Sequence, residues 1–325
     1  MRVLLVGLGR WGEKHLRVLG ELGVELWVAD VLAERRAVAV KAGVDASRAV
    51  ADFRLALPHV DAVDIATPAD SHLALAGECM RAGRDCFVEK PLALTVDEGR
   101  RLAAMVTETD RVLQVGHIFR FHPVTAALRE RLAAGALGRV RYCTGRFAGF
   151  KRPRTDVGVT QTDAIHYFDL FAHLLERDAT AVTATLRDHL GRGMDDCSFT
   201  TVEYGEVPAF IEAGYFAPGI ARDCVIVGEQ ATIVADFGTS EVRVLANRHV
   251  AGPAGWQAAE GPIESFKASG PEPLRRELER FLDVVARHGR PEVDVHAGLA
   301  TLRTVEAAQR SSVLGRRFEL AELPR

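Results

Sequence analysis

The strongest indication of the fold is the N-terminal stretch Arg2-Val3-Leu4-Leu5-Val6-Gly7-Leu8-Gly9-Arg10-Trp11-Gly12. A short apolar run leads directly into three glycines with G-x-G-x-x-G spacing, and an amphipathic segment follows. In that context the first glycine allows a tight turn, the second lets the backbone approach a pyrophosphate, and the third allows close helix–strand packing. The helix N-terminus then offers amide donors and a favourable dipole to phosphate. The stretch therefore predicts a dinucleotide-binding turn, to which Leu8, Arg10 and Trp11 also belong.

Asp30 lies at the end of the second apolar run, 18 residues after Gly12. A carboxylate there accepts hydrogen bonds from the adenosine ribose hydroxyls and repels a 2′-phosphate. Val31 follows it, with no arginine immediately there, so NAD is favoured over NADP. Arg35 and Arg36, one turn further on, keep NADP as the alternative, although they also fit a solvated helix face. An ordinary strand–helix turn would leave the glycine spacing and this acid unexplained.

Up to residue 121, short apolar runs alternate with longer amphipathic stretches, the pattern of a parallel sheet wrapped by helices. We expect strands over 3–6, 25–29, 62–66, 86–88 and 112–115, and helices over 11–22, 33–42, 71–82 and 96–107. Each strand stops at a Gly, Asp, Thr-Pro or Lys-Pro group. Candidate site residues therefore collect at the carboxyl ends of the strands, where open α/β sheets bind their ligands.

After Gly138 strand-like runs follow one another directly, which predicts an antiparallel sheet. We expect strands over 140–147, 181–186, 199–204, 209–215, 223–227 and 232–236, and helices over 163–175, 274–285 and 297–313. The stretch 247–273, rich in Gly, Pro and Ala, predicts an irregular excursion. The expected architecture is α/β followed by α+β: a doubly wound Rossmann domain over 1–121, and a domain with an open antiparallel sheet over 122–325. The C-terminal helix of the second domain can pack back on the first.

Composition excludes several classes of protein. The chain has 325 residues, 48% of them hydrophobic and 26% charged, which is typical of a globular protein, and two domains suit this length. The net charge of -3 gives no general attraction to nucleic acid or to an anionic membrane. Five scattered cysteines form no C-x-x-C pair, and no apolar run approaches the ~20 residues of a membrane span. The N-terminal apolar run is too short for a signal peptide. We expect a cytoplasmic protein.

Glu89-Lys90-Pro91 follows the apolar run 86–88 and supplies the first candidate catalytic residue. Pro91 makes the chain leave the strand at once, which places Lys90 at the carboxyl edge of the sheet. A lysine there can hydrogen-bond a substrate hydroxyl and stabilise the alkoxide that forms as hydride leaves. The alternative is a surface lysine paired with Glu89.

Thr67-Pro68 with His72 ends the preceding apolar run and is a second cofactor-side group. Pro68 stops the strand ladder, and the hydroxyl of Thr67 can face the cofactor. Taken alone, a Thr-Pro pair more often marks only the start of a loop.

Asp163, His166, Asp169 and His173 recur at three- and four-residue steps, so on a helix they form one stripe. His166, with an ordinary pKa near ~6.5, can act as a base, and a carboxylate one turn away can orient it. A metal site would need a second acidic helix, which the chain does not supply, so we expect no metal. The other alternative is a set of capping and packing residues, with a core face made by Ile165, Phe168 and Leu170.

In this order the motifs resemble the glucose–fructose oxidoreductase/inositol dehydrogenase (Gfo/Idh/MocA) family. The resemblance covers nearly the whole chain and rests on Gly7 to Gly12, Thr67-Pro68 with Ser71-His72, Glu89-Lys90-Pro91, Val115 to Pro123, and His166-Tyr167-Phe168-Asp169-Leu170. It implies a Rossmann domain, then a domain with an open antiparallel sheet used for oligomer contacts, so we expect a homodimer or homotetramer. It also implies NAD(P)-dependent oxidation or reduction of a sugar or polyol hydroxyl.

Carried over residue by residue, Lys90 is the active-site lysine, and His166 is the active-site histidine, commonly the base. Arg120 falls in the segment that lines the nicotinamide or the substrate. Many members have an aspartate four residues before the histidine, where this chain has Thr162 and the acid is Asp163. That shift rotates the carboxylate by roughly 100° around a helix. Asp163 therefore does not simply inherit the aspartate's role.

The Trp11-Gly12 start and the segment 116–123 look most like the sugar-nucleotide branch of the family. Lys151-Arg152-Pro153-Arg154 is a basic loop suited to a diphosphate, and Arg152 and Arg154 are candidate substrate ligands; a solvated charge run is the alternative. We therefore expect oxidation of the 3-hydroxyl of a UDP-N-acetylhexosamine, as in UDP-N-acetylglucosamine 3-dehydrogenases. The other interpretations are a free monosaccharide or inositol dehydrogenase, and a non-catalytic NAD-binding sensor or scaffold.

Overall fold

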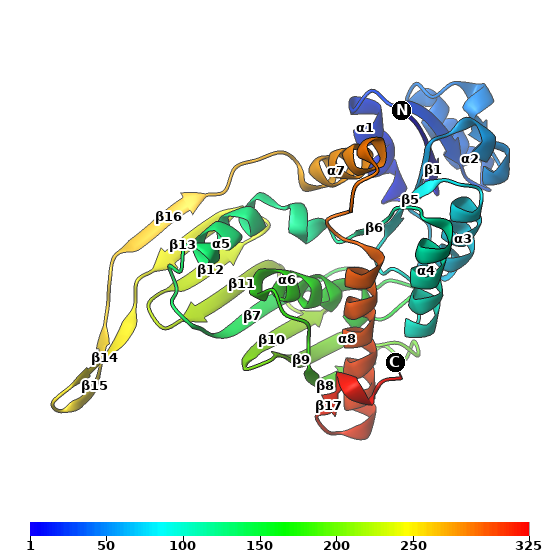
Figure 1. Cartoon of the computed structure of the whole chain (residues 1–325). Helices are drawn as coiled ribbons and strands as arrows, with labels where there is room; N and C mark the ends of the chain where they lie inside the picture. The colour runs from blue at the N-terminus through cyan, green and yellow to red at the C-terminus, as the bar shows by residue number, and fades with distance from the viewer. Residues whose placement is uncertain (325) are drawn as a thin grey trace. The chain divides into compact units, whose positions relative to one another are not determined.

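The computed structural model describes residues 1–324, which form two compact units. Unit 1 comprises residues 1–118 and 272–302, and unit 2 comprises residues 119–271 and the described chain from residue 303 onward. Figure 1 shows the elements of each unit along the chain. The domain boundary between residues 121 and 122 stays a prediction.

Unit 1 is built on a six-stranded parallel sheet with the order β3-β2-β1-β4-β5-β6. Its strands are β1 (Arg2–Val6), β2 (Glu25–Ala29), β3 (Ala49–Val50), β4 (Ala62–Ile65), β5 (Asp85–Glu89) and β6 (Leu113–Gly116). This is the strand order of a doubly wound Rossmann sheet, whose order reverses between β1 and β4. The predicted fold class is confirmed for this part of the chain. The sequence analysis missed the two-residue β3, which is too short to give an apolar pattern.

The helices of unit 1 are α1 (Gly12–Glu21), α2 (Ala33–Lys41), α3 (His72–Arg81), α4 (Val96–Thr109) and α7 (Pro273–Arg287). Local sequence explains their ends: Thr95 and Glu98 form a reciprocal capping box at the start of α4. The helical spacing seen over 274–285 corresponds to the buried face of α7. There Phe281 packs edge-to-face on Phe87 of β5, with ring centroids 5.8 Å apart.

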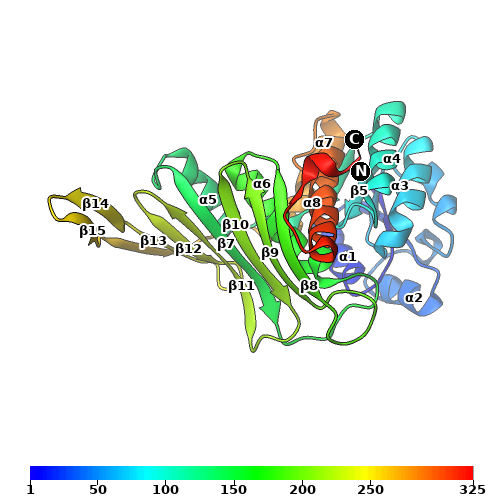
Figure 2. The same ribbon diagram turned by 90° about the horizontal axis from the view of Figure 1, so that it is seen from below.

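Unit 2 is built on a nine-stranded sheet with the order β16-β13-β12-β11-β7-β10-β9-β8-β17, seen from below in Figure 2. Its strands are β7 (Val140–Gly149), β8 (Ala181–Arg187), β9 (Cys197–Tyr204), β10 (Val207–Gly214), β11 (Ile220–Gly228), β12 (Thr232–Asp236), β13 (Glu241–Leu245), β16 (Ile263–Lys267) and β17 (Phe318–Glu319). Neighbouring strands are antiparallel except β7 and β10, which are parallel. The predicted antiparallel sheet is thus confirmed with one exception, since β10 joins β7 only after the chain has passed through a helix and the β8–β9 pair.

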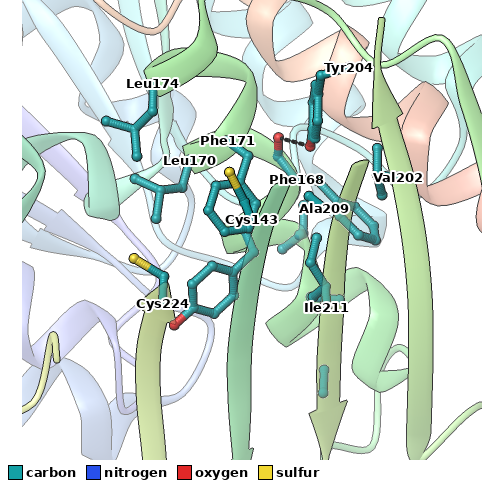
Figure 3. Packing of buried hydrophobic residues seen from close by; sticks show 14 of the residues in the cluster. Cys143, Phe168, Leu170, Phe171, Leu174, Val202, Tyr204, Ala209, Ile211 and Cys224 are labelled. Atoms are coloured by element: carbon teal, nitrogen blue, oxygen red, sulfur yellow. Dashed lines mark hydrogen bonds between the residues drawn. The ribbon is translucent and has the colours of Figure 1, made fainter. Parts of the chain in front are cut away.

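Helix α6 (Ile165–Leu175) packs on one face of this sheet. Figure 3 shows its Phe168, Phe171 and Leu174 among side chains of the strands, and the Tyr204 hydroxyl donates a hydrogen bond to the Phe168 carbonyl at 2.8 Å. Unit 2 also contains α5 (Pro123–Ala133), which the sequence analysis missed. α8 (Val295–Leu314) begins in unit 1 and continues into unit 2. In the described part of the chain, no helix combines the length and the apolar character needed to cross a membrane.

The irregular excursion predicted over 247–273 is wrong. The segment contains a hairpin of β14 (Arg248–Gly252) and β15 (Gly255–Ala259), and then β16, which pairs with β13. In Figure 1 the hairpin is the yellow arm beyond β13 and β16. Its glycines mark a tight turn, where Gly255 has φ of +108°, and are no sign of missing strands. Most side chains of these strands are exposed, so the alternating apolar signal that reveals a strand is absent.

Candidate active site

Two of the three glycines in the turn after β1 are required by the packing of unit 1 itself. Gly7 has φ of +92°, and a Cβ built on it would lie 2.7 Å from Thr67 Cγ2. A Cβ on Gly12 would lie 2.0 Å from the Gly7 carbonyl oxygen. Around Gly9, by contrast, the nearest atom to a built Cβ is Nη1 of Arg35 at 3.9 Å. The packing of the chain does not require a glycine at position 9, whereas the close approach of a pyrophosphate does.

The Asp30 carboxylate is fixed at the carboxyl end of β2, beside this turn. Oδ2 accepts a hydrogen bond from the Leu8 amide at 2.8 Å, and Oδ1 accepts one from the Leu32 amide at 2.9 Å. Arg36 donates from Nη1 to the Asp30 carbonyl at 2.7 Å, while Nη1 of Arg35 lies 3.6 Å from Asp30 Oδ2. An ordered carboxylate that joins the glycine turn to β2 fits the ribose-binding role predicted for it.

Lys90 directly follows Glu89, the last residue of β5, so it lies at the carboxyl edge of the sheet as predicted. The loop that carries it is tied to the loop after β4 through His72. Nδ1 of His72 lies 2.9 Å from the Pro91 carbonyl, and Nε2 lies 3.0 Å from the Thr67 carbonyl. Burial lowers the pKa of His72. Its ring thus links two loops of unit 1, and direct contact with a cofactor stays a prediction for Thr67, Pro68 and His72.

A buried polar network behind Lys90 was missed by the sequence analysis. His15 of α1 lies between two carboxylates: its Nδ1 is 2.8 Å from Asp64 Oδ2, and its Nε2 is 3.1 Å from Glu89 Oε1. Trp11 donates from Nε1 to the same Glu89 oxygen at 2.5 Å, and the Lys90 amide donates to Glu89 Oε2 at 3.1 Å. A detectable signal was available, because Asp64 stands inside the otherwise apolar run 62–65, where a charged residue needs a buried partner.

The charges of this network are strongly coupled. Burial by itself would lower the pKa of His15, but the adjacent Asp64 and Glu89 outweigh it and raise the pKa to about 10. Burial raises the pKa of Asp64, which His15 partly offsets. For Glu89, burial would raise the pKa, yet hydrogen bonding and attraction from His15 lower it. The geometry favours a protonated His15 between two acceptors.

In unit 2, the ring of His166 belongs to a cluster of aromatic side chains, in which Phe119 and Phe147 also contact each other with centroids 5.9 Å apart. It stacks on Phe119 at 4.8 Å between centroids and on Phe147 at 5.1 Å, with interplanar angles of 23° and 14°. Phe237 stacks on Phe119 at 4.6 Å, and the Arg222 guanidinium lies 3.5 Å from the Phe147 centroid. These ring contacts restrict the plane of the imidazole. Sequence analysis missed the cluster, because its members come from four separate segments.

Asp163 belongs to a π-helical turn over Thr160–Ala164, directly before α6. Its Oδ2 accepts a hydrogen bond from Lys151 Nζ at 2.6 Å. Thr162, which stands where many relatives carry the aspartate, places Oγ1 3.2 Å from the Gly158 carbonyl and 3.3 Å from the Tyr215 hydroxyl. The predicted stripe on a single α-helix is therefore correct for His166, Asp169 and His173, but Asp163 lies in the preceding π-turn, where the spacing around the axis differs.

Arg120 and Asp169 form a buried ion pair. Nε of Arg120 lies 3.0 and 2.9 Å from the two carboxylate oxygens, and Nη2 lies 2.5 Å from Oδ1. Because Asp169 is on α6 and Arg120 precedes α5, the pair fixes the helix that carries His166. His173, one turn further along α6, has its pKa lowered to about 4, mainly by burial and next by the charge of Arg120.

The basic loop predicted for a diphosphate is partly neutralised by carboxylates. Arg154 binds Asp156 through two hydrogen bonds of 2.8 and 2.5 Å, which holds the pKa of that carboxyl below its ordinary value. Lys151 is held by Asp163, whereas Arg152 is exposed. Among residues 1–324 no three His, Cys, Asp or Glu side chains are grouped so that they could hold a metal ion.

Two family models match the chain. One, described as "Oxidoreductase family, NAD-binding Rossmann fold", matches residues 1–117, and the other, "GFO/IDH/MocA C-terminal domain", matches residues 125–234. The first model identifies the glycine turn and Asp30 as parts of an NAD-binding domain.

Curated relatives and a solved structure agree with these matches. An inositol 2-dehydrogenase of Saccharopolyspora erythraea is 30% identical, over 100% of this chain and 98% of the relative. A UDP-N-acetylglucosamine 3-dehydrogenase of Acidithiobacillus ferrooxidans is 36% identical, over 52% of this chain and 53% of the relative. A structure with the latter description superposes with a TM-score of 0.83 and 26% identity, over 96% of this chain and 97% of that one.

Proposed function

Because the chain belongs to the Gfo/Idh/MocA family of NAD-binding oxidoreductases, we propose that it oxidises the 3-hydroxyl of a UDP-N-acetylhexosamine to a 3-keto sugar nucleotide. The observation that carries this choice is the likeness to a UDP-N-acetylglucosamine 3-dehydrogenase. That likeness is 36% identity over about half of the chain and a TM-score of 0.83 over nearly all of it. The class of reaction, oxidation of a sugar hydroxyl, follows from the family.

In the proposed mechanism, Nε2 or Nδ1 of His166 accepts the proton of the substrate hydroxyl while the carbonyl double bond forms. The Lys90 ammonium donates a hydrogen bond to the same oxygen and stabilises its developing negative charge. NAD, when bound, supplies the acceptor of the hydride that leaves the carbon. Gly9 and the amides after it would lie at the pyrophosphate, and Asp30 at the ribose.

The preorganisation of both groups supports this assignment. The Lys90 backbone is bound through Glu89 and, one residue on, through His72. The His166 imidazole stacks on both Phe119 and Phe147, which restricts the plane of its ring. Fixed rings and fixed backbone cost little reorganisation during the reaction, which is the main source of rate enhancement by a polar site.

The second candidate function is oxidation of inositol or a free monosaccharide. It is favoured by the inositol 2-dehydrogenase that matches this chain over its full length at 30% identity. Lys151 pairs with Asp163 and Arg154 pairs with Asp156, and these ion pairs reduce the positive charge of the loop assigned to a diphosphate.

We further propose that the enzyme is a cytoplasmic homodimer or homotetramer that associates through the open face of the unit 2 sheet. That face exposes aromatic side chains, namely Tyr142, Phe199 and Phe210. Exposed aromatic patches of this kind mark association surfaces. Light scattering is expected to give a mass of at least two chains, and a monomeric mass would contradict the proposal. The five cysteines are free, as in a reducing compartment.

The test is turnover with purified enzyme, NAD, and a panel of UDP-sugars, free sugars and inositols, followed by absorbance of the reduced nicotinamide. An aminotransferase with glutamate removes the keto product, which otherwise accumulates and stops the reaction. We expect turnover on a UDP-N-acetylhexosamine that is lost in Lys90→Ala. Turnover on inositols alone would establish the second candidate. NADH binding without turnover on any compound would favour a sensor.

A further inference from the structure

The buried network behind Lys90 contains three ionisable side chains, those of His15, Asp64 and Glu89, where apolar side chains would be enough to pack unit 1. His15 and Asp64 are completely buried and Glu89 is 7% exposed, in the middle of an apolar sheet-and-helix layer. The His15 ring lies edge-to-face on Phe87 at 5.7 Å between centroids. Burying charges costs free energy even when they are paired, and replacing such a set by apolar side chains is often neutral or stabilising. A set of this kind is therefore better explained by what it holds in place.

The direction of the hydrogen bonds shows what is held. When His15 is protonated, it donates from both ring nitrogens, to Asp64 on β4 and to Glu89 on β5. Trp11 adds a second donor to Glu89 Oε1, which leaves Oε2 directed at the Lys90 amide at 3.1 Å. The chain of bonds thus runs from the middle of β4, through α1, to the backbone from which the Lys90 side chain leaves.

The neighbouring strand leaves room for this arrangement. Gly116 is the last residue of β6, and a Cβ built on it would lie 3.1 Å from Glu89 Cδ. Any larger residue there would push on the Glu89 carboxylate. The Glu89 side chain is therefore bounded by α1 on one side and by β6 on the other, and it has few alternative rotamers.

We propose that His15 is a positioning residue for Lys90: it clamps the Glu89 carboxylate against the Lys90 amide and so fixes the origin of the catalytic ammonium. The catalytic part of this inference rests on the proposed function, because it takes Lys90 as the group that binds the reacting hydroxyl. The inference that His15 holds the Glu89 carboxylate against the Lys90 amide does not depend on that function.

His15→Gln tests the proposal, since the glutamine amide has one donor atom where His15 has two, so that its acceptor oxygen replaces the second donor. Hydrogen exchange of individual amides is the readout that needs no substrate. We expect the Lys90 amide to exchange at least tenfold faster in the variant, while the amides of Phe87 and Val88 in β5 keep their rates. Asp85→Asn is the matched control: Asp85 is a buried carboxylate at the other end of β5, where it accepts from the Val112 amide at 2.9 Å. It should leave exchange at Lys90 unchanged.

Kinetics separate positioning from a general structural effect. His15→Gln should lower kcat at least tenfold and change the dissociation constant of NADH less than threefold, whereas Asp85→Asn should change neither. In a Lys90→Ala background, His15→Gln should lower the residual kcat by less than a further threefold, because the residue that it positions is gone. Should His15→Gln fail to fold, Trp11→Phe removes the other donor to Glu89 and should accelerate Lys90 exchange in the same way.

An unchanged rate of exchange at Lys90 in a folded variant would overturn the proposal, as would equal acceleration of every amide in β5. An additive loss of kcat in the Lys90→Ala background would overturn its catalytic part. These results are distinct from failure of the proposed function, which would show as absence of turnover in the unmodified enzyme while exchange at Lys90 still responds to His15→Gln.

Discussion

Gly9 and Gly12 belong to one motif, but the structure assigns them opposite responses to alanine. At Gly12 the new Cβ would lie 2.0 Å from the Gly7 carbonyl oxygen, so the backbone must shift to relieve the clash. Overpacking of this kind costs about 1–3 kcal/mol, and occasionally more. At Gly9 the nearest atom is the end of the flexible Arg35 side chain at 3.9 Å, and φ is not positive. There an alanine restricts the unfolded chain and stabilises the fold by about 0.4–1 kcal/mol.

Although Gly9→Ala should stabilise the fold, we expect it to weaken the binding of NADH. Its Cβ would occupy the open space where the backbone approaches the pyrophosphate, and loss of one hydrogen bond to a charged group costs about 1.5–3 kcal/mol. Since every 1.4 kcal/mol is a factor of ten, Gly9→Ala should weaken NADH about ten- to a hundredfold. Urea unfolding of the free protein and fluorescence titration with NADH measure the two effects separately. A Gly9→Ala variant that binds NADH as tightly as the unmodified protein would contradict the role assigned to Gly9, and so would one destabilised as much as Gly12→Ala.

Three further predictions concern charged groups. Arg120→Gln removes the guanidinium from Asp169, which is 1% exposed, and should destabilise the protein by about 3–5 kcal/mol in urea unfolding, because breaking a buried pair leaves a charge uncompensated. His15, with its pKa raised to about 10, should show no imidazole titration by NMR between pH 6 and 8; its stabilising contribution is complete below its ordinary pKa of 6.5 and is lost as the pH rises toward 10. His173, with its pKa lowered to about 4, resists protonation in the folded state, so the stability of the fold should fall as the pH drops from 6.5 toward 4. His173→Asn should remove about 1–2 kcal/mol of that loss in urea unfolding, after allowance for the partial exposure of the side chain.

The fold of unit 1 could be predicted from local sequence because each of its signals is local. The glycine spacing, the short apolar runs and the capping box at Thr95 all act within a few residues. The hairpin over 248–259 could not be predicted in this way. Its strands are stabilised by backbone pairing with each other, with exposed side chains on both faces, so the sequence carries no alternating pattern.

The same difference between local and distant sequence signals applies to the candidate site. Lys90, His166 and Asp30 could be found because strand ends and helical spacing locate them. The partners of these residues could not, since they are distant in sequence: His15 lies 74 residues from Glu89, and Arg120 lies 49 residues from Asp169. The π-turn at Asp163 was equally invisible, because a helical pattern does not reveal a local change in the number of residues per turn.

Transfer of the hydrogen from carbon 3 of the sugar to the nicotinamide identifies both the substrate and the oxidised position. UDP-N-acetylglucosamine carrying deuterium at carbon 3 is incubated with the enzyme, NAD, aminotransferase and glutamate, and the nicotinamide product is analysed by mass spectrometry. We expect deuterium in the reduced nicotinamide, and its absence in a parallel incubation with Lys90→Ala. Reduced nicotinamide without deuterium would contradict the assignment to the 3-hydroxyl. Formation of NADH from inositol, but not from the nucleotide sugar, would contradict the substrate class.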